Sequence, residues 1–161
     1  MKKRTIFLSL TILVLIIALS FGQAIQFTLW QDDNALIFKL QHLEEQAGVF
    51  GPGPAGLGAY RYIVLPYIPI YEVFGMNVPI FYLYALFFYF LAAASVFLLA
   101  KYLTKNNIVA LLSGAIFSAG FIGSDGILRL FNSVQTSYSV FFVSSFFLLL
   151  YRFIKTKHAI Y

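Results

Sequence analysis

The stretch from Thr5 to Phe27 contains no charged residue and is long enough to cross a lipid bilayer as a helix. A bilayer requires about 20 consecutive apolar residues in regular structure, because lipid offers no other partner for backbone N–H and C=O groups. Pro79 to Ala100 is a second stretch of this kind. The chain is 61% hydrophobic and only 11% charged, whereas soluble domains carry about 25% charged residues. The sequence therefore predicts an all-α membrane protein.

Four stretches of the chain are apolar enough to be membrane spans, and they predict one polytopic domain over residues 1–161. The predicted spans cover residues 5–27, 79–100, 108–122 and 134–151, with a long loop at 28–78. The basic segment Lys2-Lys3-Arg4 precedes the first span, as it would in a secretory signal peptide. The apolar core of a signal peptide is about 7–15 residues long, and this run is longer, which favours an uncleaved anchor.

The distribution of charge gives these spans an orientation. With the N-terminus in the cytoplasm, eight of the eleven basic residues fall on the inner side, namely Lys2, Lys3, Arg4, Lys101, Lys105, Arg152, Lys155 and Lys157. All six acids fall on the outer side, namely Asp32, Asp33, Glu44, Glu45, Glu72 and Asp125. An excess of Lys and Arg in cytoplasmic loops is the usual pattern of membrane proteins. We therefore expect an integral multi-pass protein of the plasma membrane. The net charge of +5 then follows from topology and requires no nucleic acid partner.

The extracytoplasmic loop is predicted to begin with a short amphipathic helix. Asp32-Asp33-Asn34 are residue types that begin helices, and Leu36, Leu40 and Leu43 follow at helical spacing. Such a helix is suited to lie on the membrane surface or on other helices. The glycine- and proline-rich stretch "GVFGPGPAGLGA" then ends the helical pattern.

The end of this loop, Tyr60–Gly75, is apolar but interrupted by Pro66 and Pro69. Each proline removes a backbone donor, and lipid supplies no replacement partner. We therefore predict an interfacial or re-entrant segment. The alternative is a kinked full span, which would invert the later spans and lose the agreement with the charge pattern. The tyrosines of the chain are predicted mainly to form an aromatic belt at the membrane interface.

Charged residues on the outer side are candidate groups for chemistry on a phosphate-bearing substrate. Asp32 and Asp33 can together bind a hard divalent cation, Mg²⁺ or Mn²⁺, through oxygen ligands. One of them can instead accept a proton from a substrate hydroxyl. Arg61 and Arg129 can hold a phosphate, since guanidinium makes bidentate contacts with it.

Each of these groups also has a structural interpretation. Asp32 and Asp33 can simply cap the helix that follows and favour its positive end. Arg61 can extend to the interface or pair with an acid, and Arg129 can be ordinary loop polarity. Asn132 can be a residue that starts the last helix. On spacing alone, a pair of aspartates is a weak signal.

The order of features is similar to the N-terminal part of the GT-C fold glycosyltransferases, polytopic membrane enzymes that use lipid-linked sugars. The similarity lies in a basic start, one span, "DD" with "ALIF", then "GVFGPG", and a proline-bearing stretch that ends in "VFG". It implies a sugar donor on polyprenyl phosphate, as in mannosyl- or arabinosyltransferases. The acceptor would be a lipid, glycan or protein of the cell envelope. It also implies that Asp33 or Asp32 is the catalytic base or metal ligand, with Asp33 preferred. Arg61, Arg129 and Asn132 are then candidates for substrate binding.

Two departures from the family keep a second interpretation open. Many members have Arg-Tyr-Ala after the acidic pair, where this chain has Lys39-Leu40-Gln41. Members generally have about twice as many spans, so the chain resembles the N-terminal part of a larger fold or a short relative. The alternative is a non-catalytic four-span subunit that packs against a larger membrane partner through small residues such as Gly114 and Gly120. Transport is less favoured, because no charge falls inside a predicted span.

Overall fold

A computed structural model describes residues 3–29, 31–41, 65–120 and 129–158. These residues form helices and short connections, as the fold prediction expected. In chain order the elements are α1 (Lys3–Phe21), the 3₁₀ turn η1 (Gly22–Gln26), α2 (Gln31–Gln41), the 3₁₀ turn η3 (Leu65–Tyr67), α4 (Ile68–Phe74), α5 (Val78–Thr104), α6 (Asn107–Ala119), α8 (Leu130–Ser133), the π-helical segment η4 (Val134–Tyr138) and α9 (Ser139–His158).

Three of the helical stretches are long and apolar enough to cross a membrane. They run over Arg4–Gln26, Val78–Thr104 and Gln135–Thr156, with 23, 27 and 22 residues. These three stretches indicate a multi-pass membrane protein. The predicted span at 108–122 is different, because α6 has only 13 residues. At 1.5 Å per residue such a helix is about 20 Å long, short of the roughly 30 Å bilayer core. Three of the four predicted spans thus coincide with helices that are long and apolar enough to cross a membrane.

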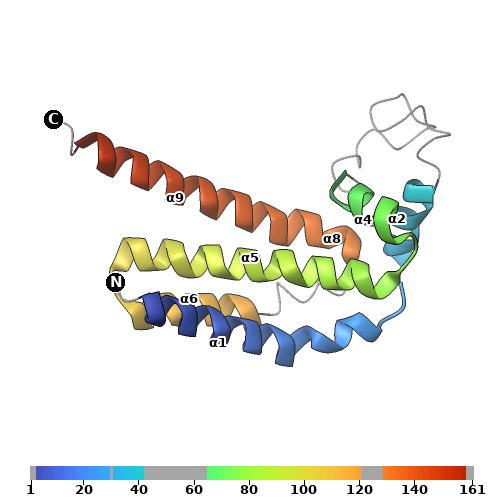
Figure 1. The fold of residues 1–161 in the computed structure, drawn as a ribbon, viewed down its shortest axis with the longest axis horizontal. Coiled ribbons are helices and arrows are strands. Elements are labelled where there is room, and N and C mark those ends of the chain that lie inside the picture. The colour runs from blue at the N-terminus through green and yellow to red at the C-terminus, as the bar shows by residue number, and fades with distance from the viewer. Residues whose placement is uncertain (1–2, 30, 42–64, 121–128, 159–161) are drawn as a thin grey trace.

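The elements are arranged with two distinct ends (Figure 1). The short helices α2, α4 and α8 gather at one end, which we call the acidic end because Asp32, Asp33 and Glu72 lie on α2 and α4. The start of α1, the turn between α5 and α6, and the last part of α9 lie at the other end. We call this the basic end. The opposite placement of acids and bases follows the predicted charge pattern.

The described parts of the outer loop remain at the acidic end. In α2, Leu36 and Leu40 are buried while Asn34 and Gln41 are exposed, so the amphipathic helix is confirmed up to Gln41. Leu43 and the glycine-rich stretch at 48–59 lie outside the described residues. The proline-bearing segment forms η3 and α4, and α4 has only seven residues. It is about 10 Å long, so α4 does not cross a bilayer by itself. Residues 60–64 of the predicted segment lie outside the described residues, so the choice between a re-entrant segment and a kinked full span stays a prediction.

The helix α5 forms the centre of the bundle and contacts α1, α6 and α9. Small residues on α5 and α6 permit these close contacts. A methyl group on Gly114 of α6 would lie 3.1 Å from Leu13 of α1 and 3.1 Å from Phe97 of α5. The three helices therefore approach one another at Gly114, as small residues allow in membrane helix packing.

The tyrosine prediction needs a correction, because four of the described tyrosines lie in the core, namely Tyr67, Tyr82, Tyr89 and Tyr138. Tyr67 and Tyr82 have no exposed surface and Tyr89 is 1% exposed. The Tyr89 hydroxyl donates a hydrogen bond of 2.6 Å to the carbonyl of Phe117, near the end of α6. The last carbonyls of a helix lack intrahelical partners, and lipid provides none. Tyr89 thus stabilises the end of α6 and does not belong to an interfacial belt.

Candidate functional site

Asp33 lies in the first turn of α2, and its side chain is completely buried. The helix begins at Gln31, so both aspartates are inside the helix and neither is the residue that precedes it. The predicted capping position is therefore wrong, although a carboxylate in the first turn still favours the helix dipole. Consecutive residues of a helix point about 100° apart, so Asp32 and Asp33 cannot both face α5. The side chain of Asp32 lies outside the described residues.

Two tyrosines connect Asp33 to the rest of the acidic end. The Tyr82 hydroxyl, at the start of α5, is hydrogen-bonded to the Asp33 side chain. The same hydroxyl lies 3.3 Å from the carbonyl oxygen of Thr28, just before α2. A buried carboxylate is stable only where donors replace the water that it loses. Tyr82 is one such donor, and it joins the start of α2 to α5.

Tyr67 forms the second link, between η3 and α8. Its hydroxyl donates a hydrogen bond of 2.8 Å to the carbonyl of Leu130 and is also hydrogen-bonded to the Ser133 hydroxyl. The Ser133 hydroxyl also lies 2.7 Å from the Leu130 carbonyl, so its single proton can be donated to that carbonyl when it is not donated to Tyr67. We call Asp33, Tyr67, Tyr82 and Ser133 the Asp33 cluster. Its members come from four elements that are far apart in sequence.

The electrostatics of the cluster keep the Tyr67 hydroxyl protonated. Complete burial raises the pKa of Tyr67 above its ordinary value, because the phenolate would be removed from water. The hydrogen bond from Ser133 acts in the opposite direction and is the weaker effect, while the nearby Asp33 carboxylate raises this pKa further. Tyr67 is therefore a hydrogen-bond donor at any physiological pH.

The structure brings two of the predicted substrate-binding residues, Arg129 and Asn132, to the same end. Arg129 directly precedes α8, and its carbonyl accepts hydrogen bonds from the backbone N–H groups of Asn132 and Ser133. Both Arg129 and Asn132 are partly exposed and have further interactions. Because Ser133 belongs to the Asp33 cluster and α8 contacts α2, these two residues lie beside the cluster. Arg61 lies outside the described residues.

The described part of the chain contains no cluster of side chains that could by itself hold the predicted divalent cation. No group of three or more His, Cys, Asp or Glu side chains gathers in residues 3–29, 31–41, 65–120 and 129–158. Mg²⁺ is commonly held by one or two carboxylates together with substrate phosphates. Metal binding by Asp32 and Asp33 therefore stays a prediction.

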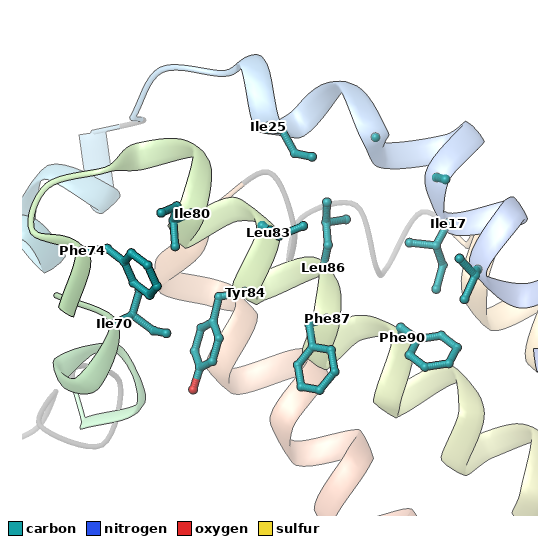
Figure 2. Close-up of a pocket in the computed structure, with 13 residues that line it drawn as sticks. Ile17, Ile25, Ile70, Phe74, Ile80, Leu83, Tyr84, Leu86, Phe87 and Phe90 are labelled. Atoms are coloured by element: carbon teal, nitrogen blue, oxygen red, sulfur yellow. The ribbon is translucent and has the colours of Figure 1, made fainter. Parts of the chain in front are cut away.

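An apolar groove lies close to the Asp33 cluster. It has a volume of about 620 Å³ and is lined by residues of α1, η1, α4 and α5. Figure 2 shows Ile17 and Ile25 on one side of the groove, Leu83 and Leu86 of α5 on the other, and Phe74 of α4 near one end. With so few polar atoms, this lining suits a hydrocarbon chain.

One tyrosine separates the groove from the cluster. Tyr84 lines the groove, and its hydroxyl points away from α1 (Figure 2). Its ring packs edge-on against the ring of Tyr67, with 5.8 Å between the ring centres. The groove and the Asp33 cluster are thus neighbouring parts of one region, one apolar and one polar.

Sequence reasoning did not identify Tyr67, Tyr82 or Ser133 as members of the site. The sequence favours an interfacial belt for the tyrosines. Ser133, between Asn132 and Gln135, has no sequence pattern that marks it as part of a site. A usable signal was the position of Tyr67 between Pro66 and Pro69. The two prolines fix their own φ angles and so restrict the backbone on both sides of Tyr67.

Comparison of the chain with protein-family models, with curated proteins and with solved structures found no match. The similarity to GT-C fold glycosyltransferases therefore remains a hypothesis based on the sequence motifs.

Proposed function

We propose that this chain is a membrane glycosyltransferase or the N-terminal part of one. It transfers a sugar from a polyprenyl-phosphate donor to a lipid, glycan or protein acceptor. The reaction takes place at the outer face of the plasma membrane, and the N-terminus of the chain is in the cytoplasm. The acidic end is then the extracytoplasmic end.

The observation that supports this proposal is the pairing of a buried carboxylate with an apolar groove. The groove between α1 and α5 suits the prenyl chain of the donor, and Tyr84 separates it from the Asp33 cluster by the width of one ring. Arg129 and Asn132 lie beside the cluster, where a donor phosphate would emerge from the groove. A lipid-linked phosphate and a carboxylate base are both needed for this reaction.

In the proposed sugar transfer, each residue of the site has one role. The acceptor hydroxyl oxygen attacks the anomeric carbon of the donor sugar, and the bond between that carbon and the phosphate oxygen breaks. The polyprenyl phosphate leaves with the bonding electrons, and Arg129 stabilises its charge. The proton of the acceptor hydroxyl passes to Asp33, the general base. Tyr82 and Tyr67 keep that carboxylate in position.

A direct test uses membranes that contain the full chain with its natural partners. Polyprenyl phosphates that carry mannose or arabinose are supplied, and the transfer of labelled sugar to endogenous acceptors is measured. Asp33→Asn keeps the size of the side chain but removes the base. We expect the rate of transfer to fall by about 10²–10⁴-fold, the usual contribution of a general base.

Glu72→Gln is the matched control, since Glu72 is an exposed carboxylate on α4 at the same end. It should transfer sugar at the wild-type rate. Membrane insertion of both variants is checked by the yield of folded protein in detergent. Normal transfer by a folded Asp33→Asn, Asp32→Asn double variant would exclude the assignment.

A second candidate is the non-catalytic subunit, which is favoured by the complete burial of Asp33. A carboxylate enclosed on all sides can act purely as an anchor of α2 on α5. In this case Asp33→Asn leaves the function of the assembly unchanged, because asparagine can still accept the hydrogen bond from Tyr82.

A bulky substitution at Gly114 distinguishes packing within the chain from packing against a partner. Its position between Leu13 and Phe97 is inside the chain, so the predicted role of Gly114 in binding a partner is not supported by this contact. Gly114→Leu should therefore destabilise the isolated chain, by about 1–3 kcal/mol for overpacking. Unchanged stability of the isolated chain, together with loss of a co-purifying partner, would instead support the subunit.

A further inference from the structure

The basic end contains a cavity that the proposed reaction does not use. It has a volume of about 540 Å³ and lies between α5 and α9 at the end opposite to the Asp33 cluster. Three lysines line it. They are Lys101 of α5, Lys105 directly after α5, and Lys155 of α9. Tyr102 and Tyr151 complete its polar lining. Charges from two helices thus converge on one space.

No carboxylate of the described residues is near enough to neutralise this charge. The described acids lie on α2 and α4 at the acidic end (Figure 1). Three ammonium groups around one cavity repel one another, so an anion placed there would be stabilised by all three. The positive-inside rule explains why lysines are present at this end, but it does not require them to line the same cavity.

An apolar groove between the same two helices shares Tyr151 with this cavity. It has a volume of about 370 Å³ and is lined by Leu99, Leu103, Phe147, Leu150, Tyr151 and Ile154. Tyr151 lines both spaces, and its ring lies 6.1 Å from that of Tyr102 on α5. Figure 1 shows α9 diverging from α5 toward the basic end.

We propose that this cavity and groove together bind one anionic phospholipid. The phosphate lies among Lys101, Lys105 and Lys155, and an acyl chain lies in the groove between α5 and α9. Charge complementarity identifies the headgroup, and the apolar lining identifies the chain. Basic pockets between membrane helices are recognised sites for anionic lipids. This site is separate from the proposed glycosyltransferase site and does not depend on it.

The test measures lipid binding to the full chain in detergent by native mass spectrometry. Phosphatidylglycerol and phosphatidylcholine with the same acyl chains are compared, and inorganic phosphate is the soluble alternative. We expect one phosphatidylglycerol to be retained in preference to phosphatidylcholine. Lys101→Gln and Lys155→Gln should each weaken its binding about fivefold, since each lysine contributes roughly 1 kcal/mol.

Arg152→Gln is the matched control, because Arg152 carries the same charge on α9, is exposed and does not line the cavity. It should bind phosphatidylglycerol like the wild type. An equal loss in Arg152→Gln would mean a general effect of surface charge and would overturn the proposal. Equal retention of the two lipids, or tight binding of inorganic phosphate without lipid, would also overturn it.

Discussion

The two ends of this molecule differ in how deeply their charged side chains are buried. At the acidic end, Asp33 is fully buried and hydrogen-bonded by Tyr82 of α5, and its charge also acts on the nearby Tyr67 of η3. At the basic end, Lys101 is partly exposed, Lys105 and Lys155 are exposed, and all three surround an open cavity. A buried charge is tied to the fold through its hydrogen bonds, whereas an exposed charge is solvated and contributes little to the stability of the fold. The comparison predicts that charge removal destabilises the fold at one end and not at the other.

The largest difference should come from removing Asp33 and Lys155 in turn. Asp33→Ala removes the acceptor from Tyr82 and leaves a void between α2 and α5. We expect a loss of about 3 kcal/mol in the free energy of unfolding, the upper end for a hydrogen bond to a charged group. Lys155→Ala should change it by less than about 0.5 kcal/mol, as for other surface substitutions. Unfolding by SDS in mixed micelles measures the change in unfolding free energy of both variants. Equal changes would contradict the difference between the two ends.

A smaller effect is expected at the tyrosine that joins η3 to α8. Tyr67→Phe removes the donor to the Leu130 carbonyl but keeps the ring contacts with Phe81 and Tyr84. Ser133 still donates to that carbonyl. The expected loss is therefore about 1 kcal/mol, the typical net value of one hydrogen bond. Tyr102→Phe at the basic end is the control, and it should leave the unfolding free energy unchanged.

The acidic end should also respond to alkaline pH through Tyr67. Its pKa is raised in the folded chain, so it stays protonated there while the unfolded chain ionises above about pH 10. Its contribution to stability is complete below that pH and is lost as the pH rises toward the folded pKa. Between pH 9 and 11, Tyr67→Phe should lose less stability than the wild type. Parallel pH profiles of the two proteins would show that Tyr67 does not contribute.

Hydropathy predicted the long helices well because lipid allows few alternatives. The predicted spans 5–27 and 79–100 correspond to Arg4–Gln26 and Val78–Thr104. The main differences are at the ends. The α5 helix continues to Thr104, beyond the last apolar residue, because a helix does not have to end where the lipid ends. In contrast, α6 ends at Ala119, where Tyr89 satisfies the carbonyl of Phe117.

The candidate site was less predictable, because its geometry depends on helix rotation. A helix that is apolar on all sides gives no sign of which face is buried. The sequence of α5 thus did not reveal that Tyr82 and Tyr89 point inward. The same limit applied to the aspartates, since the similarity to glycosyltransferases preferred Asp33 only slightly over Asp32. Ser133 approaches Tyr67 through tertiary contacts alone, which no local pattern records.

The smallest expected effect has the opposite sign and concerns Lys105 at the basic end. Lys105 ends α5 with φ of 55°, in the left-handed region. A residue with a side chain pays about 1–2 kcal/mol there, and glycine avoids this but costs about 0.5–1 kcal/mol in unfolded-state freedom. Lys105→Gly should therefore stabilise the chain by about 0.5–1 kcal/mol in lipid-free detergent.

The same substitution should weaken phosphatidylglycerol binding about fivefold, since it removes one of the three lysines from the cavity. Lys105→Gln separates the two effects, because glutamine lacks the charge but, like lysine, carries a side chain that is strained in the left-handed conformation. A gain in stability together with weaker lipid binding would mean that the basic end keeps a strained lysine for its ligand. A gain in stability with unchanged lipid binding would leave Lys105 as a topology signal only, and the basic end would then differ from the acidic end in exposure but not in function.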